Sequence, residues 1–342
     1  MIDMLYIFYR MTRAEYNTAF KGVQRYFEDV DKSSKLRKDG YDKQAYITNG
    51  FAKLGFQEIR FRRNEWGYHA LEIRLRPKLL LQVKAYYQLT ALSEFQDVAL
   101  RFDHILKDIL GLTVPHFFQW QVRRVEYAAD VHVQEDLIPK YLFLFKKGNL
   151  PLYFLINQET QKYWGSQTNC YFMATTVTVN WYNRYNTLLT KEKQSKKKFA
   201  DFSITRGVLR FETQLRSGYG VVKDYLNCTR AENEIMKFYK LIVGKGDYYT
   251  LDGAIQLIRS KVDCFRKKLE LERLITLIAN SSGVWQAKEL FVQGKDSSRA
   301  ADKFSKRLNQ LRKLGINPVV LPSEWGITKL ENLFDLIKAS IS

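Results

Sequence analysis

The spacing of apolar residues changes near residue 218, and this change constrains the fold more than any other feature. Before it, short segments alternate apolar and polar residues, which is the period of a β-strand with one buried face. After it, apolar residues recur at the three- and four-residue intervals of amphipathic helices. The sequence therefore predicts an α+β fold, with a mostly antiparallel sheet flanked by helices over residues 1–218 and a helical domain over residues 219–342.

Local patterns predict the individual elements. Thr12 and Glu15 have the spacing of a capping box and predict a helix after the first strand. Ser93 and Gln96 predict a second helix, which Gly111 ends. Strands are expected at residues 2–9, 56–63, 68–76, 117–133, 141–146, 151–156, 171–182 and 206–216, and later helices at 225–243, 251–279, 285–292, 299–314 and 329–341.

The chain is strongly basic: its 342 residues include 55 Lys and Arg against 36 Asp and Glu, a formal net charge of +19. Residues 1–218 carry +12 (34 basic against 22 acidic residues) and residues 219–342 carry +7 (21 against 14), so both parts suit a polyanion such as DNA. An acidic membrane surface is the competing partner. The most apolar region, residues 141–156, is too short and too interrupted by charge to span a bilayer, so we expect buried strands there and no membrane partner.

Two further features bear on the compartment. Asp3 stands where a signal peptide has Lys or Arg, and no small-residue cleavage site follows, which predicts a cytoplasmic protein. Three widely spaced cysteines, Cys170, Cys228 and Cys264, are typical neither of a disulfide framework nor of a zinc site. We expect them to be reduced thiols.

Three predicted strands carry acids on their polar faces. Alternation places Glu72 on the polar face of the first, Glu126 and Asp130 on that of the second, and Glu212 on that of the third. The plainer interpretation is the solvated side of an antiparallel sheet. The alternative is that these carboxylates converge on a divalent ion, because oxygen ligands select Mg²⁺ or Mn²⁺. His132 adds one possible imidazole ligand.

A tyrosine beside basic residues forms a second candidate site. Tyr182 follows a strand expected at residues 175–180, and Arg184 and a lysine-rich loop follow it. A phenol can attack phosphorus and leave a phosphotyrosine bond. Packing is the commoner role of a tyrosine, and a solvated loop is the plainer interpretation of the lysines, so these alternatives stay open. The lysines of this loop are Lys191, Lys193, Lys196, Lys197 and Lys198.

Two enzyme classes are excluded by their missing motifs. A tyrosine recombinase needs a His-x-x-Arg pair, and none of the four histidines has an arginine three residues later. A helicase driven by ATP needs the phosphate-binding pattern Gly-x4-Gly-Lys-Ser/Thr, which is absent from the sequence.

Several short motifs follow one another along the chain, and their order is informative. They are residues 1–5 (MIDML), Tyr68–Ile73, Arg124–Glu126, Trp181–Arg184 with Leu188, Leu209–Glu212, and the C-terminal segments Arg299–Leu314, Gly315–Ile316 and Pro318–Trp325. In this order they resemble the gene II replication proteins, the rolling-circle initiators of filamentous phages. The similarity covers most of the chain.

The resemblance implies a Rep/HUH-like nicking domain over residues 1–218 and a DNA-binding or accessory domain over residues 219–342. Such an enzyme nicks one strand of origin DNA, becomes linked to the 5′ phosphate through tyrosine, leaves a 3′ hydroxyl and later rejoins the strand. It works in the cytoplasm of a bacterial host, with a host helicase and polymerase. By position, Tyr182 matches the nucleophile, Arg184 stands where Lys is usual, and Glu126 stands where Asp is commoner. Asp130 matches a second acid of related plasmid initiators, while Thr187 replaces an expected Glu.

The candidate residues then take expected roles. Tyr182 and Arg184 are catalytic, with Arg184 or the metal favouring the phenolate. Tyr185 is either a packing residue or a second nucleophile. Mg²⁺ or Mn²⁺ is expected on Glu72, Glu126, Asp130 and Glu212, and DNA on Lys196, Lys197, Lys198, Arg210, Arg299, Lys303 and Arg307.

The C-terminal basic segment has two interpretations. Residues 299–313 contain six basic residues against the single acid Asp302, so they could present a basic face to duplex DNA. An ordinary solvated helix explains the same pattern.

Two other functions remain open at this point. A conjugative or mobilisation relaxase uses the same transesterification, and only the target origin or the genomic neighbours separate it from an initiator. A non-catalytic DNA-binding regulator would use its tyrosines only to stack on bases.

Overall fold

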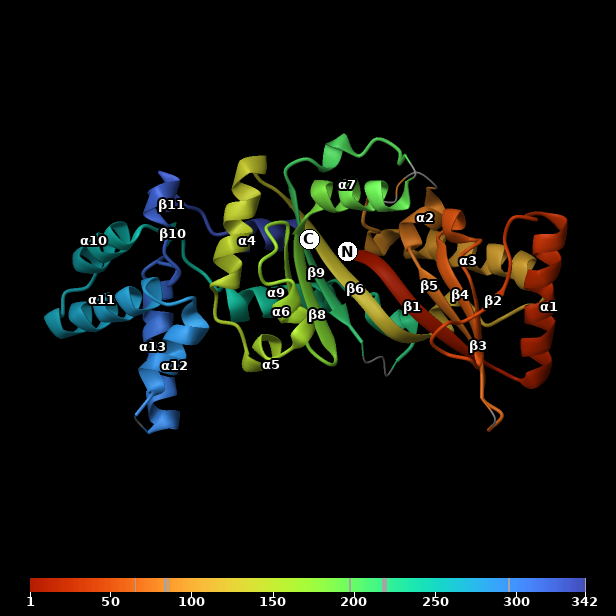
Figure 1. Cartoon of the computed structure of the whole chain (residues 1–342), viewed down its shortest axis with the longest axis horizontal. Coiled ribbons are helices and arrows are strands. Elements are labelled where there is room, and N and C mark those ends of the chain that lie inside the picture. The colour runs from red at the N-terminus through yellow and green to blue at the C-terminus, as the bar shows by residue number, and fades with distance from the viewer. Residues whose placement is uncertain are drawn as a thin grey trace.

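The computed structural model describes residues 1–64, 66–82, 85, 87–196, 198–216, 220–294 and 296–341. The protein is a mixed α/β structure with one large antiparallel sheet and many helices (Figure 1). The strands are β1 (Ile2–Met11), β2 (Arg37–Lys38), β3 (Ala45–Thr48), β4 (Phe56–Arg63), β5 (His69–Leu75), β6 (Gln121–His132), β7 (Asn169–Met173), β8 (Val177–Asn183), β9 (Val208–Leu215), β10 (Tyr248–Tyr249) and β11 (Lys329–Leu330). The helices are α1 (Arg13–Asp29), α2 (Pro77–Leu81), α3 (Phe95–Leu110), α4 (Ile138–Lys146), α5 (Leu152–Leu155), α6 (Gln158–Lys162), α7 (Arg184–Ser195), α8 (Val222–Tyr225), α9 (Cys228–Ile242), α10 (Leu251–Lys261), α11 (Phe265–Ala279), α12 (Val284–Val292), α13 (Ser297–Lys313) and α14 (Phe334–Ile341).

The large sheet has nine strands in the order β2-β3-β4-β5-β1-β6-β9-β8-β7, and every neighbouring pair is antiparallel. The N-terminal strand β1 is therefore an interior strand, between β5 and β6. This order brings the three acid-bearing strands β5, β6 and β9 close together, with only β1 between β5 and β6. The prediction of a mostly antiparallel sheet is confirmed.

Helices cover the apolar face of the sheet: α1 contacts β1 and β5, α4 contacts β7 and β8, and α9 and α14 contact β6. Four buried aromatic rings join these helices to the strands, namely Phe145 of α4, Trp181 of β8, Phe211 of β9 and Tyr239 of α9. All six pairs of these rings have centroids 5.3 to 5.9 Å apart. Aromatic pairs at such distances add about 0.5–1.5 kcal/mol each beyond the area they bury, so this cluster fixes the sheet against its helices.

The strands predicted at residues 141–146 and 151–156 are wrong. Residues 138–146 form helix α4, which begins with Pro139 in its first turn, and residues 152–155 form the short helix α5. A short apolar run has the same appearance in a buried strand and in a helix that is buried on most sides. In α4, Tyr141, Leu142, Leu144 and Phe145 are all buried.

Other boundaries also differ from the predictions. The Thr12–Glu15 capping box is confirmed at the start of α1. Ser93 and Gln96, however, do not form the expected capping box: in the short turn at Leu92–Glu94 that precedes α3, Oε2 of Glu94 accepts a hydrogen bond from the backbone N–H of Ala91. The single helix predicted at 251–279 is two helices, α10 and α11, and the strand predicted at 171–182 is the hairpin β7–β8.

Helices α10 to α13 form a unit at one end of the molecule, beyond α4 (Figure 1). The chain leaves α9 to enter this unit and returns from it to α14, so both α9 and α14 lie against the sheet. The two connections pair with each other as β10 and β11. Asn332 ties them further, because its side-chain amide donates to the carbonyls of Gly244 and Gly246. We call β10, β11 and Asn332 the neck.

The expected domain boundary near residue 218 falls on residues 217–219, which lie outside the described residues. Within the part of the chain that the structure describes, no helix combines the length and the apolar character needed to cross a bilayer.

Candidate active site on the polar face of the sheet

The strand register places the polar residues of β6, β9 and β8 side by side. Asp130, Arg210 and Tyr182 form one row across the three strands. Glu212 lies in the next row, opposite Asn180 of β8. Residues directly opposite one another in adjacent strands point to the same face, so these side chains share one surface.

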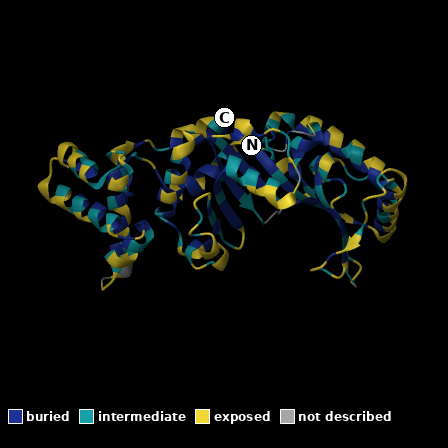
Figure 2. Ribbon diagram, turned by 45° about the horizontal axis from the view of Figure 1, so that its top comes forward, coloured by how far each residue is buried: buried dark blue, intermediate teal, exposed yellow. Residues whose placement is uncertain are grey.

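This surface is not the solvated side of a sheet. Glu72, Glu126 and Glu212 are only 1, 4 and 3% exposed, although each lies on the face opposite the apolar core. Helix α7 contacts β8 and β9, and α2 contacts β1. Figure 2 shows the strands of the central sheet as mostly buried ribbon beneath exposed helices. Buried carboxylates need partners, because an unpaired charge away from water is costly.

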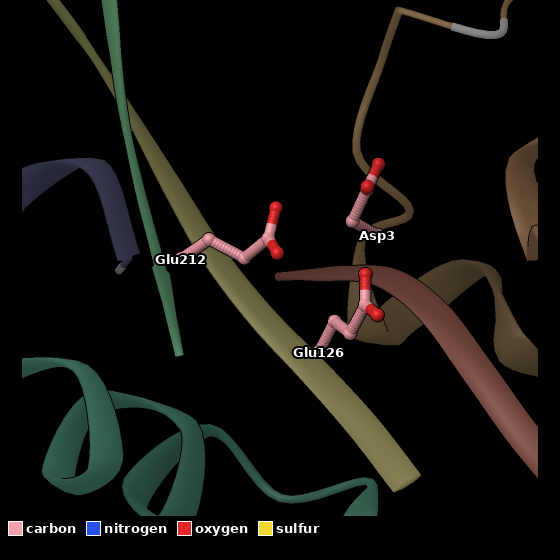
Figure 3. A group of neighbouring side chains, drawn as sticks. All are labelled: Asp3, Glu126 and Glu212. Atoms are coloured by element: carbon pink, nitrogen blue, oxygen red, sulfur yellow. The ribbon is translucent and has the colours of Figure 1, made fainter. Parts of the chain in front are cut away.

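Three carboxylates converge at the centre of this face. Oxygen atoms of Asp3, Glu126 and Glu212 all lie within 4.8 Å of one another, a set that could hold a metal ion. Figure 3 shows the three side chains pointing toward a common space from β1, β6 and β9. Two of the four predicted ligands, Glu126 and Glu212, are therefore brought together, with Asp3 as the third member. We call these residues the acidic trio.

Asp3 is absent from the ligands predicted from the sequence, and a β-bulge explains why. The pairing of β1 with β6 shifts between Ile2, which faces Tyr127, and Met4, which faces Glu126. Ile2 points into the core and Met4 to the polar face, so Asp3 is the extra residue between them. A bulge re-aims the side chain it carries. Simple alternation with Leu5 would have placed Asp3 in the core.

The charges of the acidic trio act on one another. Burial and then repulsion from Glu212 raise the pKa of Glu126 to about 8. Burial and then Asp3 also raise the pKa of Glu212. Burial alone would raise the pKa of Asp3 as well, but Arg76 and Arg210 hold it below its ordinary value. In the trio, Asp3 therefore ionises readily, whereas Glu126 and Glu212 resist ionisation.

The donor set fits a hard divalent cation. All three groups offer carboxylate oxygens, which Mg²⁺ and Mn²⁺ prefer, and they are contributed by three adjacent strands rather than by a mobile loop. A divalent cation between them would offset the repulsion that raises the pKa of Glu126. These residues therefore suit the expected Mg²⁺ or Mn²⁺ ion. Asp3 joins Glu126 and Glu212 in the ligand set, and the predicted ligands Glu72 and Asp130 are not part of it.

Tyr182 lies directly beside the trio. Its strand, β8, runs to Asn183, so Tyr182 is within the strand rather than after it. The Tyr182 hydroxyl donates a hydrogen bond to Oε2 of Glu212 at 3.0 Å, and Nη1 of Arg184 donates to the same hydroxyl oxygen at 3.4 Å. Burial first, and then Glu212, raise the pKa of the phenol, whereas Arg184 and Arg210 lower it. The side chain is 5% exposed.

The other two predicted ligands have different partners. Asp130 accepts two hydrogen bonds of 2.7 Å from Arg210. Glu72 accepts a hydrogen bond of 2.5 Å from the hydroxyl of Tyr6 and forms an ion pair of 2.8 Å with Arg123. Asp130 and Glu72 therefore belong to ion pairs and not to the acidic trio.

No family model, curated protein or solved structure matched this chain. The functional argument therefore rests on the geometry of the site itself.

Arg210 does not lie on a DNA-accessible surface. Its side chain is fully buried, and besides Asp130 it donates to Oδ1 of Asp3 at 3.1 Å and to the carbonyl of Tyr87 at 3.0 Å. These bonds leave its guanidinium engaged on three sides. Arg210 therefore positions Asp3 and Asp130 instead of contacting DNA as expected.

Part of the expected lysine loop is helix. Lys191 and Lys193 belong to α7, Lys196 forms its left-handed C-terminal cap with a φ of 53°, and Lys198 is exposed beyond it. Lys197 lies outside the described residues. Lys191 is exposed and lies near the charges of Arg76 and Arg184, so α7 brings positive charge to the polar face.

Tyr185, the second residue of α7, contacts Arg206 and Phe202. Its hydroxyl accepts a hydrogen bond of 2.9 Å from Nη2 of Arg206, whose guanidinium also lies over the ring. The ring packs against Phe202. These contacts are those of a packing residue.

The basic residues of α13 divide into two groups. Arg299 and Lys303 are exposed, as the DNA-binding prediction requires. Arg307 instead forms an ion pair of 2.8 Å with Glu270 of α11, and Arg312 donates to the carbonyl of Val243. Arg307 is therefore a structural contact within the helical unit. The sequence could not show this, because it does not reveal which side of α13 faces α11.

The three cysteines are free, with Cys170 buried and Cys228 and Cys264 exposed. This agrees with the prediction of reduced thiols.

Proposed function

We propose that this chain is a metal-dependent DNA endonuclease that nicks one strand through Tyr182, in the role of a rolling-circle replication initiator with a Rep/HUH-like nicking domain. One observation carries the proposal: the hydroxyl of Tyr182 donates to Glu212, a member of a carboxylate trio that could hold a divalent ion. A nucleophile, a proton acceptor and a metal-ligand set thus share one surface. The net charge of +19 supports DNA as the substrate.

The side chains supply the steps of a transesterification. The phenolic oxygen of Tyr182 forms a bond to phosphorus while the bond from phosphorus to the 3′ oxygen breaks, and the strand's 5′ phosphate stays on the tyrosine. The phenol proton passes to Glu212, which is within hydrogen-bond reach and whose raised pKa suits a general base. The departing 3′ oxygen takes a proton from water. Arg184 stabilises the negative charge that develops on the phenolic oxygen.

Asp3, Glu126 and Glu212 would hold the divalent ion. When bound, such an ion supplies positive charge to the phosphate oxygens in the transition state. Arg210 keeps Asp3 ionised and oriented for this role, since it bonds to Asp3 and to Asp130 at once.

The proposed reaction requires a conformational change. Tyr182 is buried in this state, so the phosphodiester reaches its hydroxyl only after part of the cover over the polar face moves. Helix α7, which begins two residues after Tyr182 and contacts β8 and β9, is part of that cover.

A non-catalytic DNA-binding regulator is the second candidate, and the same burial favours it. A tyrosine enclosed in a network of carboxylates and arginines can be purely structural. In that case the phenol contributes to stability and to no reaction.

One experiment separates the two functions. Purified full-length protein is incubated with Mn²⁺ and supercoiled DNA carrying its own replicon, and the products are resolved on a denaturing gel. Wild type and the control Tyr185→Phe should give a nicked strand with protein on its 5′ end, while Tyr182→Phe should bind DNA and leave it intact. Equal nicking by Tyr182→Phe would remove Tyr182 as the nucleophile, and binding without nicking by wild type would favour the regulator.

A further inference from the structure

Helix α13 presents two chemically different sides. Ala300, Phe304, Leu308 and Leu311 are buried and pack the helix against α11 and α12. The opposite side consists of exposed polar residues at helical spacing, which we call the outer face of α13. It comprises Arg299, Asp302, Lys303, Lys306, Asn309 and Lys313.

The rotation of α13 about its axis is fixed by two arginines. Arg307 pairs with Glu270 of α11 on one flank of the helix, and its guanidinium lies over the ring of Phe291 of α12. Arg312 bonds to the carbonyl of Val243 at the neck end. The outer face is therefore held toward solvent by the packing of the whole helical unit.

The outer face carries four positive charges and one negative charge. In the described part of the chain, no hydrogen bond or ion pair engages the head groups of Arg299, Lys303, Lys306 or Lys313. A solvated helix usually mixes charges of both signs, which form pairs three and four residues apart. A helix face with four positive charges and one negative charge fits a polyanionic partner.

A short connection joins α13 to the helix before it, and the two helices pack against each other. Helix α12 ends at Val292 and α13 begins at Ser297, so four residues join them. Gly294 in this connection has a φ of 73°, a left-handed conformation that suits glycine. Asp296 caps α13 by accepting from the N–H of Arg299. A short glycine-containing turn between two packed helices is typical of DNA-binding units whose second helix enters the major groove.

The geometry points to α13 as a recognition helix that reads duplex DNA in the major groove, with α12 as the helix before it. This assignment extends the proposed function, since it names where the duplex is held while Tyr182 acts on one strand. The major groove of B-form DNA accepts one α-helix, and recognition helices contact base edges with their N-terminal residues. Arg299 and Lys303 occupy that position.

The outer face has the chemistry for this task. Arginine and lysine donate to the O6 and N7 atoms of guanine, and asparagine can pair with adenine, so Arg299, Lys303 and Asn309 can discriminate between bases. Lys306 and Lys313 lie farther along the helix, where they can contact phosphates on either side of the groove. The face thus offers both positioning and sequence readout.

Selection from a random-sequence duplex library tests the assignment. Full-length Tyr182→Phe protein is used, so that cleavage plays no part. It should enrich one sequence motif, and methylation of guanine N7 within that motif should block binding. Arg299→Ala or Lys303→Ala should weaken binding to the motif by roughly 5- to 150-fold and relax one position of it. Arg101→Ala, which removes an exposed arginine from α3 far from this unit, is the matched control.

The outcomes separate the recognition-helix assignment from the proposed nucleophile. Failure to enrich a motif, or a loss of binding with Arg101→Ala equal to that with Arg299→Ala, would overturn it. Because both residues are exposed, their variants should keep the wild-type unfolding midpoint, which rules out misfolding as the cause. If a motif is enriched and read by α13 while Tyr182→Phe still nicks, the recognition helix stands and the proposed nucleophile fails.

Discussion

The hydroxyl of Tyr182 and Oε2 of Glu212 lie 3.0 Å apart, joined by a hydrogen bond that the tyrosine donates. The two residues come from adjacent strands, β8 and β9, so the backbone ladder fixes their separation. Glu212 also accepts a hydrogen bond of 2.7 Å at Oε1 from the side chain of Gln214. Both carboxylate oxygens are therefore oriented before any substrate arrives, which is the arrangement a proton acceptor needs.

Replacing Glu212 with Gln should lower nicking by about 100-fold or more, because a general base contributes on the order of 10² to 10⁴ and an amide cannot take the phenol proton. DNA binding should be unchanged. Glu72→Gln is the matched control: Glu72 is equally buried on the same face and also accepts from a tyrosine hydroxyl, but it lies outside the acidic trio. Rates are compared under single-turnover conditions. Similar losses in both variants would show that any change on this face disturbs the fold.

The stability of the metal-free protein should fall as the pH rises. The pKa of Glu126 is raised from 4.5 to about 8, so the folded state binds this proton more tightly than the unfolded state does. Its contribution to stability is complete below pH 4.5 and is lost as the pH rises through about 8. Thermal unfolding in EDTA measures this slope, and Glu126→Gln should reduce it.

Added Mn²⁺ should reverse that trend. A cation binds the ionised form of the trio, so it should raise the unfolding midpoint more near the upper end of this pH window than near the lower end. Glu126→Gln should bind Mn²⁺ more weakly, while Glu72→Gln should respond like wild type. A midpoint that Mn²⁺ leaves unchanged at every pH would argue against a metal site at the trio.

Arg210→Met should destabilise the protein by about 3–5 kcal/mol, because it removes a fully buried cation that bonds to both Asp3 and Asp130 and leaves the buried Asp3 paired with Arg76. Urea unfolding gives the change in free energy. The double variant Arg210→Met, Asp130→Asn should lose less than the sum of the two single variants, since the two side chains share two hydrogen bonds. Additive losses would mean that the pair is not coupled.

Two adjacent basic residues of α13 should behave in opposite ways. Arg307→Ala removes the ion pair with Glu270 and should lower the unfolding midpoint, with little effect on the salt dependence of DNA binding. Lys306→Ala should leave the midpoint unchanged and reduce the slope of log affinity against log salt by about 1, the value for one lost phosphate contact. The two variants are measured side by side by unfolding and by titration at several salt concentrations. The reverse pattern would mean that α13 is rotated relative to this structure.

The sequence predicts the sheet and its polar face, but not which acidic residues meet on that face. Alternation in β5, β6 and β9 predicted the sheet and the face that carries Glu72, Glu126 and Glu212. It could not predict which acids meet, because that depends on strand order and register. The bulge at Asp3 breaks the period of two on which such predictions rest.

The misassigned helices have a related cause. In the segment around Tyr141 most side chains are buried, so the polar positions that normally distinguish a helix from a strand are missing. The burial of the polar face was equally hidden, since a sequence shows that a residue is charged but not that α7 will lie over it. Arg210 and Arg307 illustrate the same limit: both are arginines in basic surroundings, and both serve buried or structural ion pairs.

The neck joins the helical unit to the sheet by two strands of chain rather than one. A unit on a single flexible linker samples many distances from its parent domain, whereas two connections that pair with each other and are clasped by Asn332 leave little freedom to swing. If α13 holds one stretch of duplex and Tyr182 cuts another, the protein fixes the distance between these two stretches. The number of base pairs from the recognised sequence to the nick would then be constant. Inserting bases between the two would therefore change which phosphodiester is cut, because the distance set by the protein would stay the same.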